Sequence, residues 1–232
     1  MPKAIKKRVA KKSDTPEEGV QATLSNLKDT LLERQSTALK IGIGILVIII
    51  AVVSFLVYSY TTKTTAKKLE YEAYKIYYSR GPAQAANKEE QYKKALDAFK
   101  KAYDTRKSPF SLYYIAACSF ELGQYDEALK TLKDFSQRYS GEEKLLPLVY
   151  RKMVTIYTRK GDSAEAKKTL DALYNLKSDI YKDFALMEYG RLLEKEGKPD
   201  EARKKYEELT TRFPNSPFKD EAQLKLSAKK EG

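Results

Sequence analysis

The chain contains one uninterrupted apolar stretch that is long enough to cross a membrane. From Ile41 to Thr62, 22 consecutive residues include no Asp, Glu, Lys or Arg. An α-helix rises about 1.5 Å per residue, so the stretch extends about 33 Å, against about 30 Å for a bilayer's hydrocarbon core. Lys40 precedes it, and Tyr58 and Tyr60 stand where a headgroup boundary is expected. The sequence therefore predicts a transmembrane signal-anchor helix over residues 39–61.

The distribution of charge around this stretch predicts its orientation. Six Lys and Arg residues and no acid lie among the first twelve residues, and short basic flanks are retained on the cytoplasmic side. Lys63, Lys67 and Lys68 flank the opposite end but do not match that excess. We expect residues 1–38 to form a basic cytoplasmic tail and residues after 61 to lie across the membrane. A cleaved signal peptide fits poorly, because the apolar run begins 40 residues into the chain and ends without an Ala-x-Ala-like site.

The tail also carries a short amphipathic pattern. Thr15-Pro16-Glu17-Glu18 has the residue types of a helix start. Apolar residues then recur at coiled-coil-like 4-3-4 spacing, at Val20, Leu24, Leu27 and Leu31. The pattern fits a helix that lies on the membrane surface or leads into the span, and it also fits a contact with a partner helix. Topology and acidic lipid headgroups explain the basic residues of the tail, so we expect no nucleic acid as a partner.

The segments that follow residue 62 are predicted to be helices with a repeated pattern. Gly and Pro fall between the apolar helical segments instead of within them. Three turn glycines are 38 and 36 residues apart, and an alanine follows each of them five residues later. These pairs are Gly123 with Ala128, Gly161 with Ala166, and Gly197 with Ala202. Self-similarity near 34 residues is typical of a helical solenoid.

This pattern resembles the tetratricopeptide repeat (TPR) family. The family signature pairs a small residue in the first helix of a repeat with a turn Gly, then an Ala and two large apolar residues in the second helix. The three clearest repeats carry it as Ala116, Gly123, Ala128, Leu132 and Phe135; Val154, Gly161, Ala166, Leu170 and Leu173; and Gly190, Gly197, Ala202, Tyr206 and Leu209. Small residues let paired helices approach, and the large residues interlock with the next repeat.

The resemblance implies an all-α fold. A single transmembrane helix would be followed by a TPR-like solenoid of about four repeats over residues 62–232. A capping helix from about Phe218 to Lys229 would close the solenoid, with Leu224 and Leu226 packing against it.

The sequence offers no set of residues for catalysis. It contains no histidine, which is the commonest general acid–base and metal ligand. It also shows no Gly-rich phosphate loop, no cysteine cluster and no carboxylates at metal-ligand spacing. Cys118 is the single cysteine, and its apolar neighbours indicate a buried core residue. We therefore expect no enzymatic activity, no cofactor and no bound metal.

In TPR proteins the first helix of each repeat lines a concave groove that receives a peptide or a partner helix, so the resemblance implies a groove here. Its expected residues are Phe110, Tyr113 and Phe120 in the second repeat, Leu148, Arg151 and Thr155 in the third, and Phe184, Met187 and Arg191 in the fourth. Aromatic and methionine side chains with arginines between them suit adaptable polypeptide binding. The alternative is that several of them belong to the core between repeats. Chaperone-tail-binding members have Lys and Asn where Tyr113 and Ala117 stand, so a clamp of that kind is not matched.

Taken whole, the chain resembles membrane-anchored TPR proteins of the bacterial envelope. This resemblance implies a non-enzymatic adaptor in the bacterial inner membrane, with a cytoplasmic N-terminus and a periplasmic C-terminal domain. One analogy is the ancillary subunit of the SecYEG translocon, which helps hand emerging polypeptides to periplasmic chaperones. The partners would then be the translocon, unfolded polypeptide or envelope proteins.

Other resemblances leave alternatives open. The segment from Arg212 to Ala222 is similar to repeats of the periplasmic protein that coordinates cell division with the Tol-Pal system. A second alternative is a self-associating membrane scaffold, which would be a homo-oligomer. A third is an organellar import receptor with its TPR domain in the cytosol.

Overall fold

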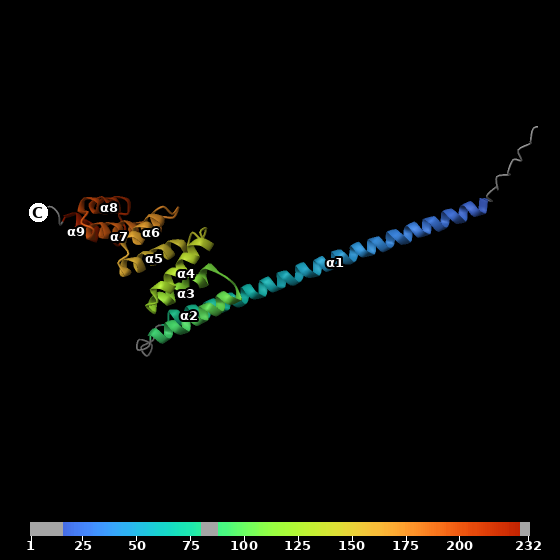
Figure 1. Cartoon of the computed structure of the whole chain (residues 1–232), viewed down its shortest axis with the longest axis horizontal. Helices are drawn as coiled ribbons and strands as arrows, with labels where there is room; N and C mark the ends of the chain where they lie inside the picture. Colours follow the sequence, from blue (N-terminus) through green and yellow to red (C-terminus); the bar gives the residue numbers. More distant parts are fainter. Residues whose placement is uncertain (1–15, 80–87, 228–232) are drawn as a thin grey trace, which may run out of the picture. The chain divides into compact units, whose positions relative to one another are not determined.

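The computed structural model describes residues 16–79 and 88–227 (Figure 1). Every regular element in these residues is an α-helix, so the all-α prediction is confirmed. The helices are α1 (Pro16–Tyr77), α2 (Lys88–Thr105), α3 (Pro109–Glu121), α4 (Tyr125–Arg138), α5 (Leu146–Lys160), α6 (Ser163–Tyr174), α7 (Lys182–Lys195), α8 (Pro199–Arg212) and α9 (Lys219–Ser227). The chain divides between Tyr60 and Thr61 into two compact units.

The first unit contains the apolar stretch of α1. Among the described residues, this helix alone is long and apolar enough to cross a membrane, by length and composition. None of its most apolar window is buried inside the protein, whereas a core helix of a soluble protein is covered by its neighbours. Leu24 and Leu27 of the tail pattern are 60% and 55% exposed. Thr15 and the side chains of Val20 and Leu31 lie outside the described residues.

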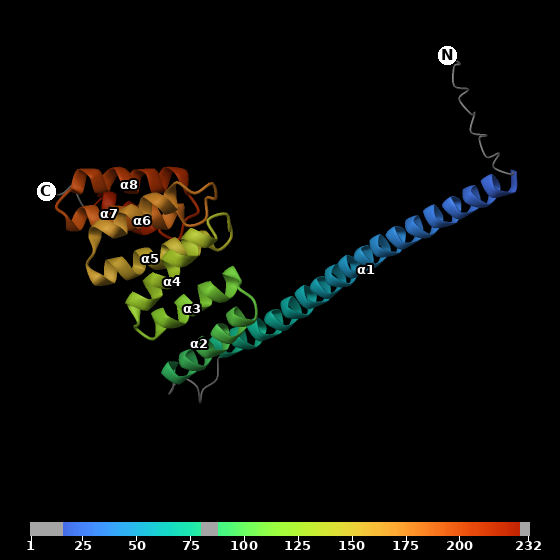
Figure 2. The ribbon, with the colours of Figure 1, turned by 45° about the vertical axis from the view of Figure 1, so that its right-hand side comes forward.

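The second unit is a row of helix pairs stacked in chain order (Figures 1 and 2). Helices α3 and α4, α5 and α6, and α7 and α8 form three pairs, and contacts of α4 with α5 and of α6 with α7 join one pair to the next. The end of α1 and α2 form the first pair, in which Ala73, Ala95 and Phe99 are fully buried together. The interior is therefore a series of local cores along one axis, as expected for a repeat protein.

Two polar contacts tie the end of α1 to the helices packed against it, one to α2 and one to α3. The Gln91 side-chain amide donates hydrogen bonds to the carbonyl oxygens of Ile76 and Tyr77 at 2.8 and 2.9 Å, so it binds carbonyl groups in the last turn of α1. The Glu70 carboxylate accepts hydrogen bonds from the hydroxyls of Ser108 and Ser111, the latter at 2.8 Å. Ser108 is also the N-cap of α3, so α1 is tied directly to the start of the second repeat.

The three predicted turn glycines adopt the same backbone conformation. Gly123, Gly161 and Gly197 have φ of 73°, 76° and 73°, in the left-handed region that favours glycine. In each turn the residue after the glycine donates its N–H to a carbonyl oxygen five residues earlier, at 2.8–2.9 Å. This is the hydrogen bond that closes a helix in a Schellman motif. The repeat register derived from these glycines is therefore correct.

The small residues of the repeat pattern lie where paired helices approach. Ala128 and Ala166 are 0% exposed and Ala202 is 1% exposed. In the fourth repeat the facing small residue is Gly190. A β-carbon built on Gly190 would lie 2.3 Å from the nearest ring carbon of Tyr206, which is itself buried. Tyr206 thus occupies the space that a side chain at position 190 would need.

Helix α9 closes the row, but its packing differs in part from the expectation. Ala222 is fully buried and Leu226 packs against the core that α7 and α8 form. Leu224, which was expected to pack, is 70% exposed. Position 224 follows the buried Ala222 by two residues on a helix, so it points to a different side. The capping role of α9 therefore rests on Ala222 and Leu226.

Replacing Gly190 with Ala tests this close approach. We expect the Gly190→Ala substitution to lower the free energy of unfolding by about 1–3 kcal/mol, because the added methyl overlaps a buried tyrosine ring. Thermal unfolding of the full chain in detergent micelles, followed by circular dichroism, measures the change. Gly141→Ala is the matched control, since nothing lies within 4 Å of a β-carbon at that position. Equal melting temperatures for the two variants would contradict this packing.

Candidate functional site

A cavity of about 290 Å³ opens between helices α3 and α5. The side chains that line it come from α3 and α5 alone, and they are Tyr113, Phe120, Leu148, Arg151, Lys152, Thr155 and Arg159. Five of these seven residues belong to the groove expected from the sequence. We call this cavity the α3–α5 groove.

Helix periodicity explains why these residues meet. Tyr113 and Phe120 are seven residues apart on α3, so they lie on one face two turns apart. On α5, Leu148, Arg151 and Thr155 are three and four residues apart, so they too share one helix face. Pro147 stands at the start of α5, where its fixed backbone suits the first helical turn. The cavity therefore lies between the first helices of two successive repeats.

Sequence reasoning missed two cations of the groove, Lys152 and Arg159. The Lys152 ammonium and the Arg159 guanidinium both lie over the ring of Phe120, at 4.2 and 4.8 Å from its centroid. Arg159 also donates a hydrogen bond of 2.8 Å to the hydroxyl of Tyr125. The signal was present in the sequence, because Arg159 is eight residues after Arg151 and so returns to the same side of α5.

The groove carries more positive than negative charge. Arg151, Lys152 and Arg159 line it and no acid does, while the carboxylate of Glu121 is 3.9 Å from the Lys152 ammonium. Burial is the main cause that lowers the pKa of Lys152 from its ordinary value, and the charge of Glu121 acts in the opposite direction. Burial is costly for a cation, and the Glu121 carboxylate offsets this cost only in part, so an anionic ligand would relieve the remainder.

Arg151, which lines the groove, lies over two aromatic rings. Its guanidinium carbon lies 4.7 Å from the centroid of the Tyr181 ring and 5.4 Å from that of Phe184. Among the described residues, Tyr181 is the one non-glycine with a positive φ, at 65°. For an L-residue this conformation costs roughly 1–2 kcal/mol. No pattern in the sequence predicted that strain at position 181.

Tyr113 contributes a neutral hydroxyl to the groove. Burial raises its pKa to about 12, with smaller contributions from Tyr78 and Tyr181 in the same direction. The phenol therefore remains protonated at neutral pH and can both donate and accept a hydrogen bond. Its ring meets that of Tyr114 edge to face, with centroids 5.3 Å apart, so the side chain is held from within the core.

The other expected groove residues do not line the cavity. Phe110 is partly buried and packs on Tyr114 with ring centroids 4.8 Å apart. Phe184 is 8% exposed and Met187 is 0% exposed, so Met187 has no surface to offer a partner. These three residues follow the inter-repeat core alternative.

Arg191 is engaged within the fourth repeat and its cap. It pairs with Glu188 at 2.5 Å and with both carboxylate oxygens of Glu221 on α9, at 2.6 and 2.7 Å. Lys225 on α9 likewise pairs with Glu194 at 2.7 Å. Side chains of α9 therefore form ion pairs with Arg191 and Glu194, which lie on the helix expected to line the groove in the fourth repeat.

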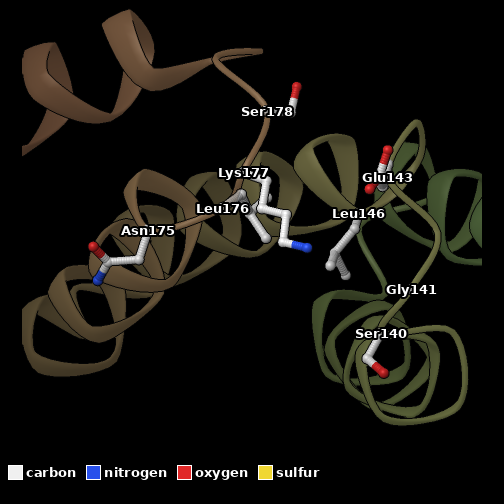
Figure 3. A pocket seen from close by; sticks show the side chains of 8 residues that line it. All are labelled: Ser140, Gly141, Glu143, Leu146, Asn175, Leu176, Lys177 and Ser178. Carbon is white, nitrogen blue, oxygen red and sulfur yellow. The ribbon is translucent and has the colours of Figure 1, made fainter.

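A second cavity, of about 260 Å³, lies at the edge of the repeats (Figure 3). It is formed by the connections before α5 and before α7, and its lining consists of Ser140, Gly141, Glu143, Leu146, Asn175, Leu176, Lys177 and Ser178. The Leu146 side chain points into the space between the two connections. One acid and one cation line this cavity, so it lacks the charge imbalance and the aromatic rings of the α3–α5 groove.

No metal-binding cluster occurs in the part of the chain that the structure describes. No three His, Cys, Asp or Glu side chains come together there in an arrangement that could hold a metal ion. Cys118 is 0% exposed, and burial raises the pKa of its thiol to about 12. A protonated and covered thiol is neither a nucleophile nor a ready ligand.

The family of the chain follows from comparison with known proteins. The profile of the family described as "Tetratricopeptide repeat-like domain" matches residues 36–230. The chain belongs to this family. TPR domains commonly mediate contacts between proteins and are generally not enzymes, which agrees with the absence of a catalytic residue set from the sequence.

Solved structures show the same fold at low sequence identity. A tetratricopeptide repeat protein from Parabacteroides merdae matches with a TM-score of 0.54 and 15% identity, over 70% of this chain and 59% of that one. A putative kinesin light chain with TPR-like repeats from Podospora anserina matches with a TM-score of 0.52 and 13% identity, over 70% and 83%. These likenesses concern the fold alone.

A curated relative is similar over a shorter part of its own length. The heat shock protein sti1 homolog of Schizosaccharomyces pombe is 30% identical over an aligned length of 160 residues, and the match covers 55% of this chain. The match spans 27% of that relative, so most of the relative has no counterpart in the match.

The state of Cys118 gives a prediction about reactivity. We expect the thiol in the folded full chain to react with iodoacetamide at pH 8 at least about a hundredfold more slowly than in denaturant, because the thiolate is scarce and covered. Mass spectrometry of the alkylated chain measures the rate. Raising the pH toward 12 should speed the folded-state reaction, since a raised thiol pKa leaves the group protonated below it. Equal rates in folded and denatured chains would show that Cys118 is accessible.

Proposed function

We propose that this chain is a membrane-tethered TPR adaptor that binds polypeptide partners in the α3–α5 groove. The observation that carries the proposal is the groove itself, which brings two aromatic rings and three cations together on the first helices of adjacent repeats. In a repeat scaffold these helices supply the binding face, and aromatic and arginine side chains dominate protein interfaces.

The tether supports an adaptor that acts close to membrane-bound partners. The apolar part of α1 is uncovered by the protein and is long enough to span a bilayer, and the basic first residues favour a cytoplasmic N-terminus. We therefore propose a single-pass protein of the bacterial inner membrane with its TPR domain in the periplasm. Confinement to the membrane raises the local concentration of the groove near such partners.

Hand-over of polypeptides from the SecYEG translocon to periplasmic chaperones is the role that we propose for this adaptor. A groove in a domain that a membrane anchor tethers suits the capture of segments as they emerge. The alternatives are a coordinator of cell division in the envelope, a self-associating scaffold and an organellar import receptor. They differ in partner and compartment, so partner identification and topology separate them.

Substituting groove residues should weaken partner binding more than folding. We expect the Tyr113→Ala/Arg151→Ala double variant to reduce the yield of crosslinked partners in intact membranes by about tenfold or more, since truncating a central aromatic or arginine residue commonly costs over 1 kcal/mol. Crosslinking followed by mass spectrometry measures the yield, and circular dichroism checks that the helical content is retained.

A matched control uses the same residue types away from the groove. Tyr71 is exposed on α1, and Arg138 on α4 pairs only locally with Asp134. The Tyr71→Ala/Arg138→Ala variant should crosslink like the unmodified chain. If the groove variant keeps the full set of crosslinks at unchanged yield, the groove is not the binding site and the scaffold alternative gains support.

The proposed topology predicts which part of the chain an external protease can reach. Protease added to intact spheroplasts should remove the domain that follows Tyr60, because it would face the outside of the inner membrane. An antibody to a tag at the N-terminus should still detect a protected fragment. Protection of the whole TPR domain would exclude a periplasmic location.

A further inference from the structure

We propose that the α3–α5 groove selects polypeptide segments that carry acidic side chains beside an apolar one, and that Tyr181 positions Arg151 for this selection. The inference rests on the proposed function, because it names the ligand class of the same groove. It also adds a residue from the fourth repeat to a groove lined by the second and third, since Tyr181 immediately precedes α7.

The ligand class follows from unequal charge. Three cations line the groove, and within the described residues neither Arg151 nor Arg159 forms an ion pair with a carboxylate. Among the three cations, Lys152 alone forms an ion pair within the described residues, with Glu121 at 3.9 Å. An incoming carboxylate would therefore meet guanidinium groups that the protein itself leaves uncompensated, and Arg binds carboxylates through paired hydrogen bonds.

The apolar part of the ligand follows from the other lining residues. Leu148 and the rings of Tyr113 and Phe120 form the apolar walls of the groove. Lys152 and Arg159 lie over the Phe120 ring, so charge and apolar surface are interleaved within one cavity. A volume of about 290 Å³ suits one or two side chains of an extended segment, with the carboxylates directed to the arginines.

We infer that Tyr181 positions Arg151 because the strained backbone at residue 181 places its ring against the guanidinium group. The residue takes φ 65° and ψ 15° without using its side chain to cap α7. The Tyr181 side chain lies against Arg151, whose guanidinium carbon is 4.7 Å from the centroid of the Tyr181 ring. The same carbon is 5.4 Å from the centroid of the Phe184 ring. A guanidinium stacked on two rings has fewer conformations to lose when a carboxylate binds.

Position 181 allows substitutions that separate the ring from the backbone. Glycine and asparagine both accept a positive φ, so Tyr181→Gly and Tyr181→Asn remove the ring while keeping the turn. Tyr181→Phe keeps the ring and removes only the hydroxyl. The Lys168→Ala variant serves as a control, because Lys168 lies on α6 with its side chain 79% exposed and does not line the groove.

The test measures selectivity for acidic side chains. The probes are a short fluorescent peptide in which a phenylalanine is flanked by aspartates, and a matched peptide in which asparagine replaces each aspartate. Fluorescence anisotropy with the full chain in uncharged detergent micelles gives both affinities. We expect the unmodified chain to bind the acidic peptide about tenfold more tightly than the amide peptide, and added salt to reduce the difference.

The variants test the part played by Tyr181. We expect Tyr181→Gly and Tyr181→Asn to lose most of the tenfold preference while affinity for the amide peptide stays within about twofold, because Arg151 is no longer held. Tyr181→Phe and Lys168→Ala should keep the preference. A merely structural role would weaken binding of both peptides together, so it would not change the ratio.

Three outcomes would overturn the inference in different ways. If the unmodified chain binds neither peptide, the groove does not bind polypeptide and the proposed function fails with it. If it binds both peptides equally, polypeptide binding stands and the acidic ligand class fails. If the preference survives in Tyr181→Gly and Tyr181→Asn, the positioning role of Tyr181 fails.

Discussion

The close approach of paired helices is the constraint on which the rest of the structure depends. Ala128, Ala166 and Ala202 have almost no exposed surface, and Gly190 leaves room for the Tyr206 ring. Because each pair packs at a short distance in the same register, successive first helices come to lie side by side. The α3–α5 groove is lined by two such helices. On each of them, residues three or four positions apart form a face that the second helix of the pair does not cover. A change in pairing distance would therefore alter the groove without touching its residues.

The repeat architecture could be predicted from the sequence because it depends on local chemistry. A glycine in a left-handed turn and an alanine five residues later are visible in the printed chain, and Gly123, Gly161 and Gly197 adopt the expected turn. The interior of the second and third repeats followed from the same register. The exposure of Leu224 did not, because a short helix with several apolar residues leaves more than one possible buried side.

The groove was predictable only in part, for reasons that lie outside each helix. Periodicity on α3 and α5 brought Tyr113, Phe120, Arg151 and their neighbours together. The same reasoning failed for Met187 and Arg191, because α7 is followed by the α9 cap, and α9 supplies Glu221 to the arginine. The place of a repeat within the solenoid thus decides whether the groove-facing side of its first helix is available to a ligand. The role of Tyr181 depends on one backbone angle, which residue type alone does not indicate.

Strain at Tyr181 also has a consequence for how this chain can change over generations. Single substitutions toward glycine or asparagine at that position relieve the backbone, so drift without selection would favour them. A bulky aromatic residue persists in a left-handed turn only where its ring contributes something that the relaxed alternatives lack. Among descendants of this chain, the residue at position 181 would therefore indicate whether Arg151 still binds a ligand, even where the groove residues themselves have not changed.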